Sequence, residues 1–361
     1  REDLAAFEKW LSDSNKIIGN KKIYVWGAGI RGTEFGIFLK RSGIRNFDFV
    51  DNNPEKQHGH IDGTDIVAPD QAISGVRNGK AIILVSTELN SEIVEQLCCA
   101  GLKGGINFFV APNLEYEHYV EEFSRPADIR DIVFGDCLFS SISLKDTNTT
   151  NLAEMVKERV GANKCKVLYM HGMGIRSYYN IFRMYGINYG FPQNLEIMVN
   201  FETLTGRQHL LPRSQHNTLL HMIDDTLEKK DEEWSEYLSV VDVRADNNQV
   251  EISHRSGRLS PQQEQEMKNR NYMRLNYMYC LDPETEGLVF FRKLVKVALD
   301  NGVRVIPFIP PVNFELGYKY FKEKFDEVYS SNLEIIKKIC DELGVVPECF
   351  SHSFTSDFFA E

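Results

Sequence analysis

Three segments of the chain place chemically useful residues directly after an apolar, strand-like run. The motif Gly27-x-Gly29-x-Arg31-Gly32 follows residues 22–26, Asp136 and Cys137 follow residues 129–135, and Asn200 ends the run 195–200. A thiol at the end of a strand is presented at the carboxyl edge of a sheet, where it can attack a carbonyl carbon while backbone N–H groups hold the oxyanion. A glycine turn between a strand and a helix instead lets a phosphate group approach the helix N-terminus. The segments therefore predict two different sites.

The glycine turn has the context that a nucleotide fingerprint requires. It lies between a predicted strand and a predicted helix over residues 33–42, and Asp51 ends the next predicted strand, 47–50. The glycines permit a tight turn, and a carboxylate at that position can accept hydrogen bonds from a ribose diol. The candidate cofactor-binding residues are therefore Gly27, Gly29, Arg31, Gly32 and Asp51. The alternative is that the glycines only pack a helix on a strand and that Asp51 caps a loop.

The stretch from Lys22 to Pro112 resembles the N-terminal nucleotide-sugar-binding domain of bacterial sugar O- and N-acyltransferases and of capsule-biosynthesis enzymes. The resemblance lies in WGAGIRG, in VDNNPEKQ with a later Gly63, and in the segment IVAP, residues 66–69. It implies a nucleotide or nucleotide-activated sugar as the ligand rather than NAD, since no hydride-transfer partner is evident.

Residues 128–361, apart from an insertion over 203–285, resemble the SGNH (GDSL-type) hydrolase and acyltransferase superfamily in FGDCLFSS, HGMGIRS and MVNFE. The segments VRVIPFIPPVNFELGYKYF and 351–359 are most similar to the branch of the teichoic-acid D-alanine transfer protein and the alginate acetylation proteins. The resemblance implies that Cys137 is the nucleophile, with Asp136 before it in the same block. It also implies that Gly174, or less well Gly172, and Asn200 donate N–H groups to the oxyanion, and that this site requires no cofactor.

Two departures from the family pattern bear on activity. Cys137 stands where the family has serine, and a thiol acts as a nucleophile only when a base or a local field generates enough thiolate. A small buried cysteine in a degenerate turn is the alternative. The family's last block is Asp-x-x-His, in which Asp357 is the candidate acid, but no histidine follows it and His352 precedes it. Either the family's histidine lies after Glu361 or the general base is absent.

Other polar residues have weaker claims to function. His171 follows a predicted strand and could approach Cys137, or serve only as a hydrogen-bonding loop residue. His216 and His221 are too poorly spaced to share a helix face, so no metal site is predicted. Asn313 follows the last long strand and would line a substrate site or end the strand in a turn.

The elements that position these residues alternate between strand and helix. This alternation predicts two α/β domains: a Rossmann-like parallel sheet over residues 1–125 that begins with a helix over 2–18, and a flavodoxin-like, SGNH-type α/β/α sandwich over 126–361. The polar and aromatic segment 113–126, which ends in Pro126, marks the boundary. Residues 203–285 are rich in charge and amides and indicate an insertion over the top of the second sheet.

Composition excludes several classes of function. Lys+Arg 41 against Asp+Glu 52 gives a net charge of -11, which disfavours nucleic-acid partners. No apolar run approaches the ~20 residues that cross a bilayer, and the first residues lack a signal-peptide pattern. Seven cysteines without a C-x-x-C pair indicate reduced thiols. We therefore expect a cytoplasmic protein, and the composition is compatible with a homo-oligomer.

Taken together, the segments favour an acyl esterase or O-acyltransferase that acts on a sugar of a bacterial surface polysaccharide, such as capsule, O-antigen or teichoic acid. The partner would be a small molecule or glycan. Two alternatives stay open: a binding or scaffold protein with a decayed SGNH-like domain, and a transferase that uses only the N-terminal nucleotide-sugar site.

Overall fold

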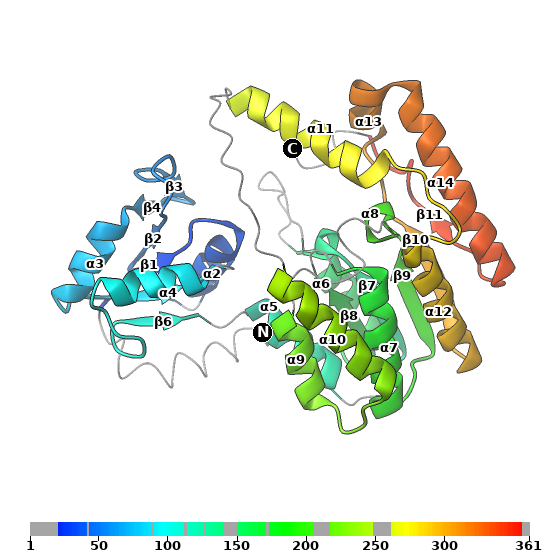
Figure 1. Cartoon of the computed structure of the whole chain (residues 1–361), viewed down its shortest axis with the longest axis horizontal. Coiled ribbons are helices and arrows are strands. Elements are labelled where there is room, and N and C mark those ends of the chain that lie inside the picture. Colours follow the sequence, from blue (N-terminus) through cyan, green and yellow to red (C-terminus); the bar gives the residue numbers. More distant parts are fainter. Residues whose placement is uncertain are drawn as a thin grey trace. The chain divides into compact units, whose positions relative to one another are not determined.

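The computed structural model divides the chain into two compact units between His118 and Tyr119 (Figure 1). It describes residues 21–41, 43–87, 90–111, 114–125, 128–140, 150–170, 173–204, 217–247 and 261–355. The helix predicted over residues 2–18 lies outside these ranges. Helix α5 (Leu114–Ser124) occupies the segment predicted to be a boundary, and buries Tyr116, Tyr119 and Phe123 at helical spacing.

Unit 1 contains a six-stranded sheet in the order β3-β4-β2-β1-β5-β6. Its strands are β1 (Lys22–Trp26), β2 (Phe47–Val50), β3 (His60–Ile61), β4 (Thr64–Val67), β5 (Ala81–Val85) and β6 (Phe108–Val110). All neighbours are parallel except β3, which pairs antiparallel with β4 at the edge. The five parallel strands follow the Rossmann order, with the change of direction between β1 and β5. The prediction of a Rossmann-like α/β fold is confirmed.

Alternating side chains along β1 explain why helices cover both faces of this sheet. Ile23 and Val25 pack with α2 (Ile30–Arg41) on one face. Tyr24 and Trp26 pack with α3 (Pro69–Arg77) and α4 (Asn90–Cys99) on the other. Because both faces are buried, the strands are apolar nearly throughout, as in other parallel sheets.

Unit 2 contains a five-stranded, fully parallel sheet in the order β11-β10-β9-β7-β8. Its strands are β7 (Asp131–Gly135), β8 (Cys165–Tyr169), β9 (Asn194–Met198), β10 (Arg304–Ile309) and β11 (Glu348–Cys349). This is the flavodoxin-like order: β8 lies on one side of β7, and the chain then crosses to the other side of β7 to form β9. The prediction of a flavodoxin-like α/β fold is also confirmed.

Helices cover both faces of the second sheet. On one face, Val133 and Val167 pack with Ala153 of α6 (Leu152–Val160) and with Phe139 of the short turn η1 (Cys137–Phe139). On the other, Phe134 stacks on Tyr178 of α7 (Ile175–Tyr189), with ring centroids 4.9 Å apart. Helix α12 (Glu286–Asp300) lies beside α7.

The predicted insertion, 203–285, contributes helices to two places. It contains the end of α8 (Phe201–Leu204), then α9 (Asn217–Thr226), α10 (Glu232–Asn247) and α11 (Pro261–Tyr277). Helix α10 packs on α9 and on the outer side of α7, whereas α11 packs against α8, α13 (Phe314–Phe321) and α14 (Glu323–Glu342). The insertion therefore adds a further layer of helix outside α7.

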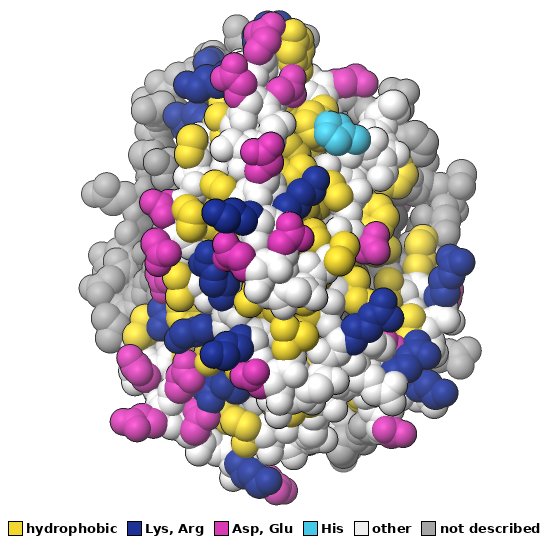
Figure 2. All heavy atoms as spheres, turned by 90° about the vertical axis from the view of Figure 1, so that its right-hand side faces the viewer, with side chains coloured by type: hydrophobic (Ala, Val, Ile, Leu, Met, Phe, Trp, Pro, Cys, Tyr) yellow, Lys and Arg dark blue, Asp and Glu magenta, His cyan; other side chains and the backbone are white. Residues whose placement is uncertain are grey.

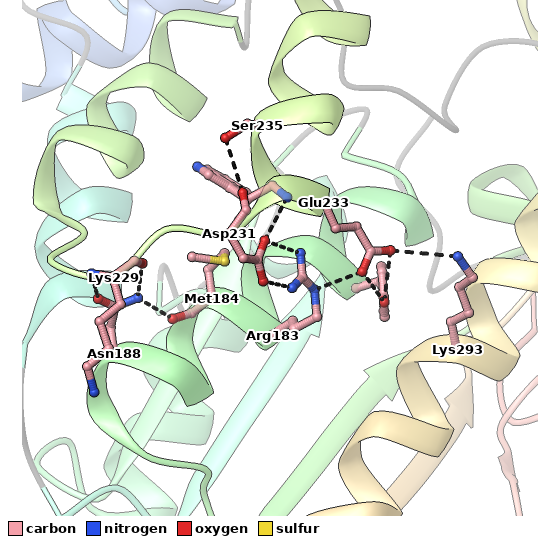
Figure 3. A network of polar contacts seen from close by, with 10 residues as sticks. Arg183, Met184, Asn188, Lys229, Asp231, Glu233, Ser235 and Lys293 are labelled. Atoms are coloured by element: carbon pink, nitrogen blue, oxygen red, sulfur yellow. Dashed lines mark hydrogen bonds and ion pairs between the residues drawn. The ribbon is translucent and has the colours of Figure 1, made fainter.

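Ion pairs and hydrogen bonds connect the start of α10 to α7 (Figure 3). The Arg183 guanidinium contacts both carboxylate oxygens of Asp231, one of them at 3.1 Å, and its Nε lies 3.6 Å from Glu233. Glu233 also lies 3.7 Å from Lys293 of α12 and accepts a hydrogen bond from Tyr179. One network thus joins three helices of unit 2.

The segment after β10 forms two helices, α13 and α14, with a break at Lys322. Lys322 has φ 55°, a left-handed backbone conformation that ends the first helix.

The exposed face on the right of Figure 1, shown in Figure 2, mixes basic and acidic side chains with scattered hydrophobic ones. In the described part of the chain, every helix is too short or too polar to span a membrane.

Candidate functional site

The glycine turn lies at the carboxyl edge of unit 1, where the strand order changes direction. Gly27 follows β1 with φ +124°, and a Cβ there would lie 2.4 Å from Thr87 Cγ2 and 2.7 Å from the Ser86 carbonyl oxygen. A Cβ on Gly32 would lie 1.6 Å from the Gly27 carbonyl oxygen. These two glycines are required because the turn packs closely on α2 and on the end of β5.

Gly29 differs from its two neighbours, because a Cβ there would have no atom within 4 Å. Helix α2 begins at the next residue, so the residue before it has no side chain to cap the first N–H groups. The hydroxyl of Thr87 is buried beside Gly27 without a hydrogen-bond partner among the described residues. An open helix N-terminus beside an unpaired hydroxyl fits a phosphate group, so these residues could hold the phosphates of a nucleotide.

Asp51 is engaged locally. The Ala28 N–H donates to Asp51 Oδ2 at 3.1 Å, and the Asn53 N–H donates to Oδ1 at 2.9 Å. The Lys56 ammonium lies 3.0 Å from Oδ2 and also donates to the Ala28 carbonyl oxygen at 3.2 Å. Asp51 therefore ties its own loop to the glycine turn, and a ribose diol would have to displace Lys56 from this carboxylate.

Arg31, the fifth residue of the glycine motif, lies on the first turn of α2. Its guanidinium stands 5.5 Å from the ring centroid of Tyr116 in α5. Its carbonyl oxygen accepts a hydrogen bond from the Ser86 hydroxyl at 3.5 Å. The structure thus brings Gly27, Gly29, Arg31, Gly32 and Asp51 to one edge of the sheet.

The second candidate site centres on Asp136, the residue directly after β7. Asp136 is 1% exposed, and burial raises the pKa of its carboxyl group despite two hydrogen bonds that oppose the shift. Oδ1 accepts the Leu138 N–H at 2.9 Å, which closes the turn η1. Oδ2 accepts the Asn200 amide at 2.9 Å. The carboxyl group therefore joins the ends of β7 and β9 at the switch point, where ligands bind in open α/β sheets.

Asn200 is itself held in place by the start of α8. It is buried, and its carbonyl oxygen accepts both the Thr203 hydroxyl at 2.7 Å and the Thr203 N–H at 3.0 Å. One N–H of its amide is directed to Asp136. An amide carries two N–H groups, so the second can serve an oxyanion.

Gly174 precedes α7 and is buried. Its carbonyl oxygen accepts the Ser177 N–H at 2.9 Å, so it forms the N-terminal end of the helix. Four residues later, the Tyr178 hydroxyl donates to the Gly135 carbonyl oxygen at 2.8 Å. The first turn of α7 therefore lies over the end of β7, which brings Gly174 to the same edge of the sheet as Asp136.

Cys137 is the first residue of η1 and directly follows Asp136. Phe139, the last residue of η1, packs its ring against Gly135. A Cβ on Gly135 would lie 2.2 Å from the Phe139 ring, so this turn forms only with glycine at that position. The side chain of Cys137 lies outside the described part of the structure, as do residues 171–172 and Asp357. The structure therefore unites the Cys137 turn, Gly174 and Asn200 at one edge and does not address the predicted base.

The remaining cysteines fall into two chemical groups. Burial raises the pKa of the Cys165 and Cys340 thiols to about 12, so both are poor nucleophiles at neutral pH. Cys98, Cys99, Cys280 and Cys349 are exposed. Exposed thiols can compete for a reagent, and the buried ones cannot.

Among the other polar residues singled out in the sequence, His216 lies outside the described part of the chain, and His221, His352 and Asn313 have structural partners. His221 Nε2 lies 2.9 Å from Asp242 Oδ1 across α9 and α10. His352 stacks on Phe314, with ring centroids 3.9 Å apart. Asn313 caps α13 by accepting the Leu316 N–H at 3.0 Å, which agrees with the turn interpretation. Within the described ranges, no three His, Cys, Asp or Glu side chains are grouped to hold a metal ion.

Sequence reasoning missed three residues of these sites. Lys56 stands five positions after Asp51, a spacing visible in VDNNPEK, and could have been identified as its partner. Thr87 lies beside Gly27 because β5 pairs with β1, and Tyr178 contacts Gly135 because α7 packs over the end of β7. A single sequence carries no direct signal for either arrangement.

No family model and no curated protein matches the chain. Among solved structures, UDP-D-quinovosamine 4-dehydrogenase from Vibrio fischeri is similar to it at 19% identity and a TM-score of 0.22, over 28% of this chain and 84% of that chain. The assignment of the fold therefore rests on strand order and register.

Proposed function

We propose that the chain is an acyl esterase or O-acyltransferase that acts on a sugar of a bacterial surface polysaccharide, at the carboxyl edge of unit 2. The observation that carries the proposal is the Asp136–Asn200 hydrogen bond of 2.9 Å. It aligns an amide donor with the turn that carries Cys137 at the switch point of the sheet. A nucleophile and oxyanion donors in that arrangement serve acyl transfer.

In the proposed reaction the Cys137 thiolate attacks the carbonyl carbon of an acyl ester. A carbon–sulfur bond forms, and the carbonyl oxygen takes the negative charge, which the second Asn200 N–H and backbone N–H groups of the two turns stabilise. Collapse of the intermediate expels the alcohol as an alkoxide, which takes a proton from solvent water, and leaves a thioester on Cys137. Water or a sugar hydroxyl then attacks the thioester and gives its proton back to the solvent, and collapse of the second intermediate releases the thiolate and completes hydrolysis or transfer.

Asp136 has a positioning role in this scheme. It accepts hydrogen bonds from both the Cys137 turn and Asn200, and it is too deeply buried to meet a substrate. Its carboxyl group therefore fixes the distance between the nucleophile and the oxyanion donor. Loss of that connection would separate the two without removing either.

Unit 1 would hold a nucleotide or a nucleotide-sugar at the glycine turn. Support comes from the open side of Gly29, the uncapped start of α2 and the unpaired Thr87 hydroxyl. The Lys56 ammonium, next to the turn, would add a positive charge for a diphosphate. Acceptance of the ribose by Asp51 requires Lys56 to turn from the carboxylate to the phosphates.

The test uses an activated acetyl ester and mass-spectrometric mapping of the acylated residue. We expect the label on Cys137, with loss of labelling in Cys137→Ala and full labelling in Cys349→Ala, a matched control that removes an exposed thiol of the same unit. Labelling of the exposed cysteines without Cys137 would refute the nucleophile and favour the decayed, non-catalytic alternative.

A second measurement distinguishes the proposed acyl esterase or O-acyltransferase of unit 2 from a transferase that uses only unit 1. Titration with UDP and ADP is compared between the native chain and Gly29→Ala, with Gly104→Ala as a control that also has room for a Cβ, 3.4 Å from the Phe108 ring. If unit 1 alone carries the activity, Gly29→Ala abolishes it and Cys137→Ala does not.

A further inference from the structure

A group of exposed apolar side chains borders the Cys137 turn. Leu138 of η1 is 42% exposed, and Leu152 and Met155 of α6 are 43% and 40% exposed. Single exposed apolar residues are common on protein surfaces, but these three lie on η1 and α6, two elements in contact with each other, and η1 carries the proposed nucleophile. We call Leu138, Leu152 and Met155 the apolar rim.

The rim residues belong to elements that pack on each other. Phe139 of η1 packs with Ala153 and Val156 of α6 in one buried cluster. Leu152 and Met155 lie one turn apart on an adjoining face of the same helix, about 4.5 Å along its axis. Leu138 follows Cys137 directly in the chain, and η1 contacts α6, so the rim extends from the turn of Cys137 to the start of α6.

The start of α6 is unsuited to an anion. Asn151 caps it by accepting the Glu154 N–H at 2.8 Å, and the Glu154 carboxylate accepts the Asn151 N–H at 3.0 Å. This capping box satisfies the helix end internally and places a negative charge there. A phosphate or carboxylate would be repelled, whereas a hydrocarbon chain would cover Leu152 and Met155.

We infer that the apolar rim binds the alkyl chain of the acyl group, so that the preferred donor is an acyl ester of medium chain length rather than an acetyl ester. The inference rests on the proposed function, since the chain is delivered by its carbonyl at Cys137. A chain of about six carbons extends from the nucleophile along roughly one turn of α6. Each methylene that it buries against the rim is withdrawn from water.

The experiment measures kcat/KM for p-nitrophenyl acetate, butyrate, hexanoate and octanoate, each divided by its rate with free glutathione to remove intrinsic reactivity. Half-covered methylenes give about a twofold gain each, and hexanoate has four more of them than acetate, so hexanoate should exceed acetate by roughly 15-fold. In Leu152→Gln and Met155→Gln this ratio should fall to about twofold. Leu299→Gln, at a residue of α12 that is 40% exposed, should keep the native ratio.

The outcomes separate the inference from the proposed function. A native ratio near one, with Cys137 still acylated, overturns the apolar rim and leaves the acyl-transfer function intact. An equal fall of the ratio in the Leu299 variant also overturns the rim, because the effect would not depend on position. Failure of every ester, including acetate, to acylate Cys137 overturns both.

Discussion

At the carboxyl edge of each sheet an acidic residue directly follows a strand, but the two residues make different contacts. In unit 1, Asp51 follows β2 and contacts Ala28, Asn53 and Lys56, all within its own loop or the adjoining turn. In unit 2, Asp136 follows β7 and reaches across to Asn200, which follows β9. Asp51 is balanced by a lysine, whereas Asp136 is buried with amide donors only.

This difference separates an adjustable site from a fixed one. A carboxylate paired with an exposed ammonium can exchange its partner for a ligand at small cost, because such ion pairs contribute little in water. A buried carboxyl group that joins two strands cannot move without leaving donors unsatisfied. Unit 1 is therefore suited to exchange of a charged ligand, and unit 2 to fixed alignment of reacting groups.

The largest effect is expected at the glycine turn of unit 1. In Gly32→Ala the new Cβ would meet the Gly27 carbonyl oxygen at 1.6 Å, so the start of α2 must shift, at a cost of about 3 kcal/mol in unfolding free energy. Gly29→Ala should cost less than about 1 kcal/mol, since its Cβ has open space. Urea unfolding of both variants measures the contrast, and equal losses would mean that the turn does not pack as described.

The next effect tests the cross-strand carboxyl group. Asp136→Ala leaves the Leu138 N–H and the Asn200 amide without an acceptor, which should lower the unfolding free energy by about 2 kcal/mol. Asp136→Asn should cost less, because its amide oxygen can still accept the Leu138 N–H while the Asn200 amide turns over. Chemical denaturation gives both values, and an Asn variant as unstable as the Ala variant would contradict this account.

An effect of similar size concerns Glu196, a partly buried carboxylate of β9 whose Oε2 has no hydrogen-bond partner among the described residues. Burial, together with the Asp131 carboxylate, raises the pKa of Glu196 from 4.5 to about 7. The folded state therefore binds the proton more tightly than the unfolded state, so the unfolding free energy falls as pH rises from 4.5 to 7. Glu196→Gln should remove this fall and stabilise the protein by about 2 kcal/mol above pH 7.

Denaturation of this variant and of the native chain at pH 5 and pH 8 isolates the effect of Glu196, because other titrating groups cancel in the difference. The exposed Glu348→Gln serves as the control. A difference between native chain and variant that stays constant with pH would contradict the burial of a titrating group at this position.

The smallest effect is expected at Asp51. Asp51→Asn keeps an acceptor for only one of the Ala28 and Asn53 N–H groups and loses the charge that holds Lys56, at a cost of about 1 kcal/mol, since these contacts are partly exposed. UDP affinity should respond more than stability does, because Lys56 becomes available to the phosphates while the ribose loses a charged acceptor. Calorimetric titration at two salt concentrations distinguishes these contributions, since the phosphate contact alone weakens strongly with salt.

Much of the fold could be predicted from local patterns. The apolar runs at 22–26 and 47–50 coincide with β1 and β2, and the run 129–135 contains β7. Helix α5 was missed although Tyr116, Tyr119 and Phe123 follow helical spacing, because the aromatic content of 113–126 was interpreted as a boundary. The break at Lys322 has no glycine or proline to announce it.

The sites could be predicted only as far as strand ends determine them. That Asp136 and Asn200 each follow a strand is readable from the sequence, but their contact depends on β9 lying beside β7 rather than beside β8. Asp51 and Lys56 are five residues apart and could have been paired. Contacts within one loop are thus accessible to sequence reasoning, whereas contacts between strands require the order of the sheet.

The layer of helices outside α7 has a consequence for how unit 2 opens. Nearly every turn of α7 is buried, between Phe134 on the sheet side and α10 and α12 on the other, with Tyr237 donating to Ser177 at 2.7 Å. Amide hydrogens of α7 can then exchange with solvent only after the α10 layer detaches or the whole unit unfolds. Helix α7 directly follows Gly174, so the exchange rates of its amide hydrogens would report how often the edge of the sheet that carries Cys137 unfolds locally.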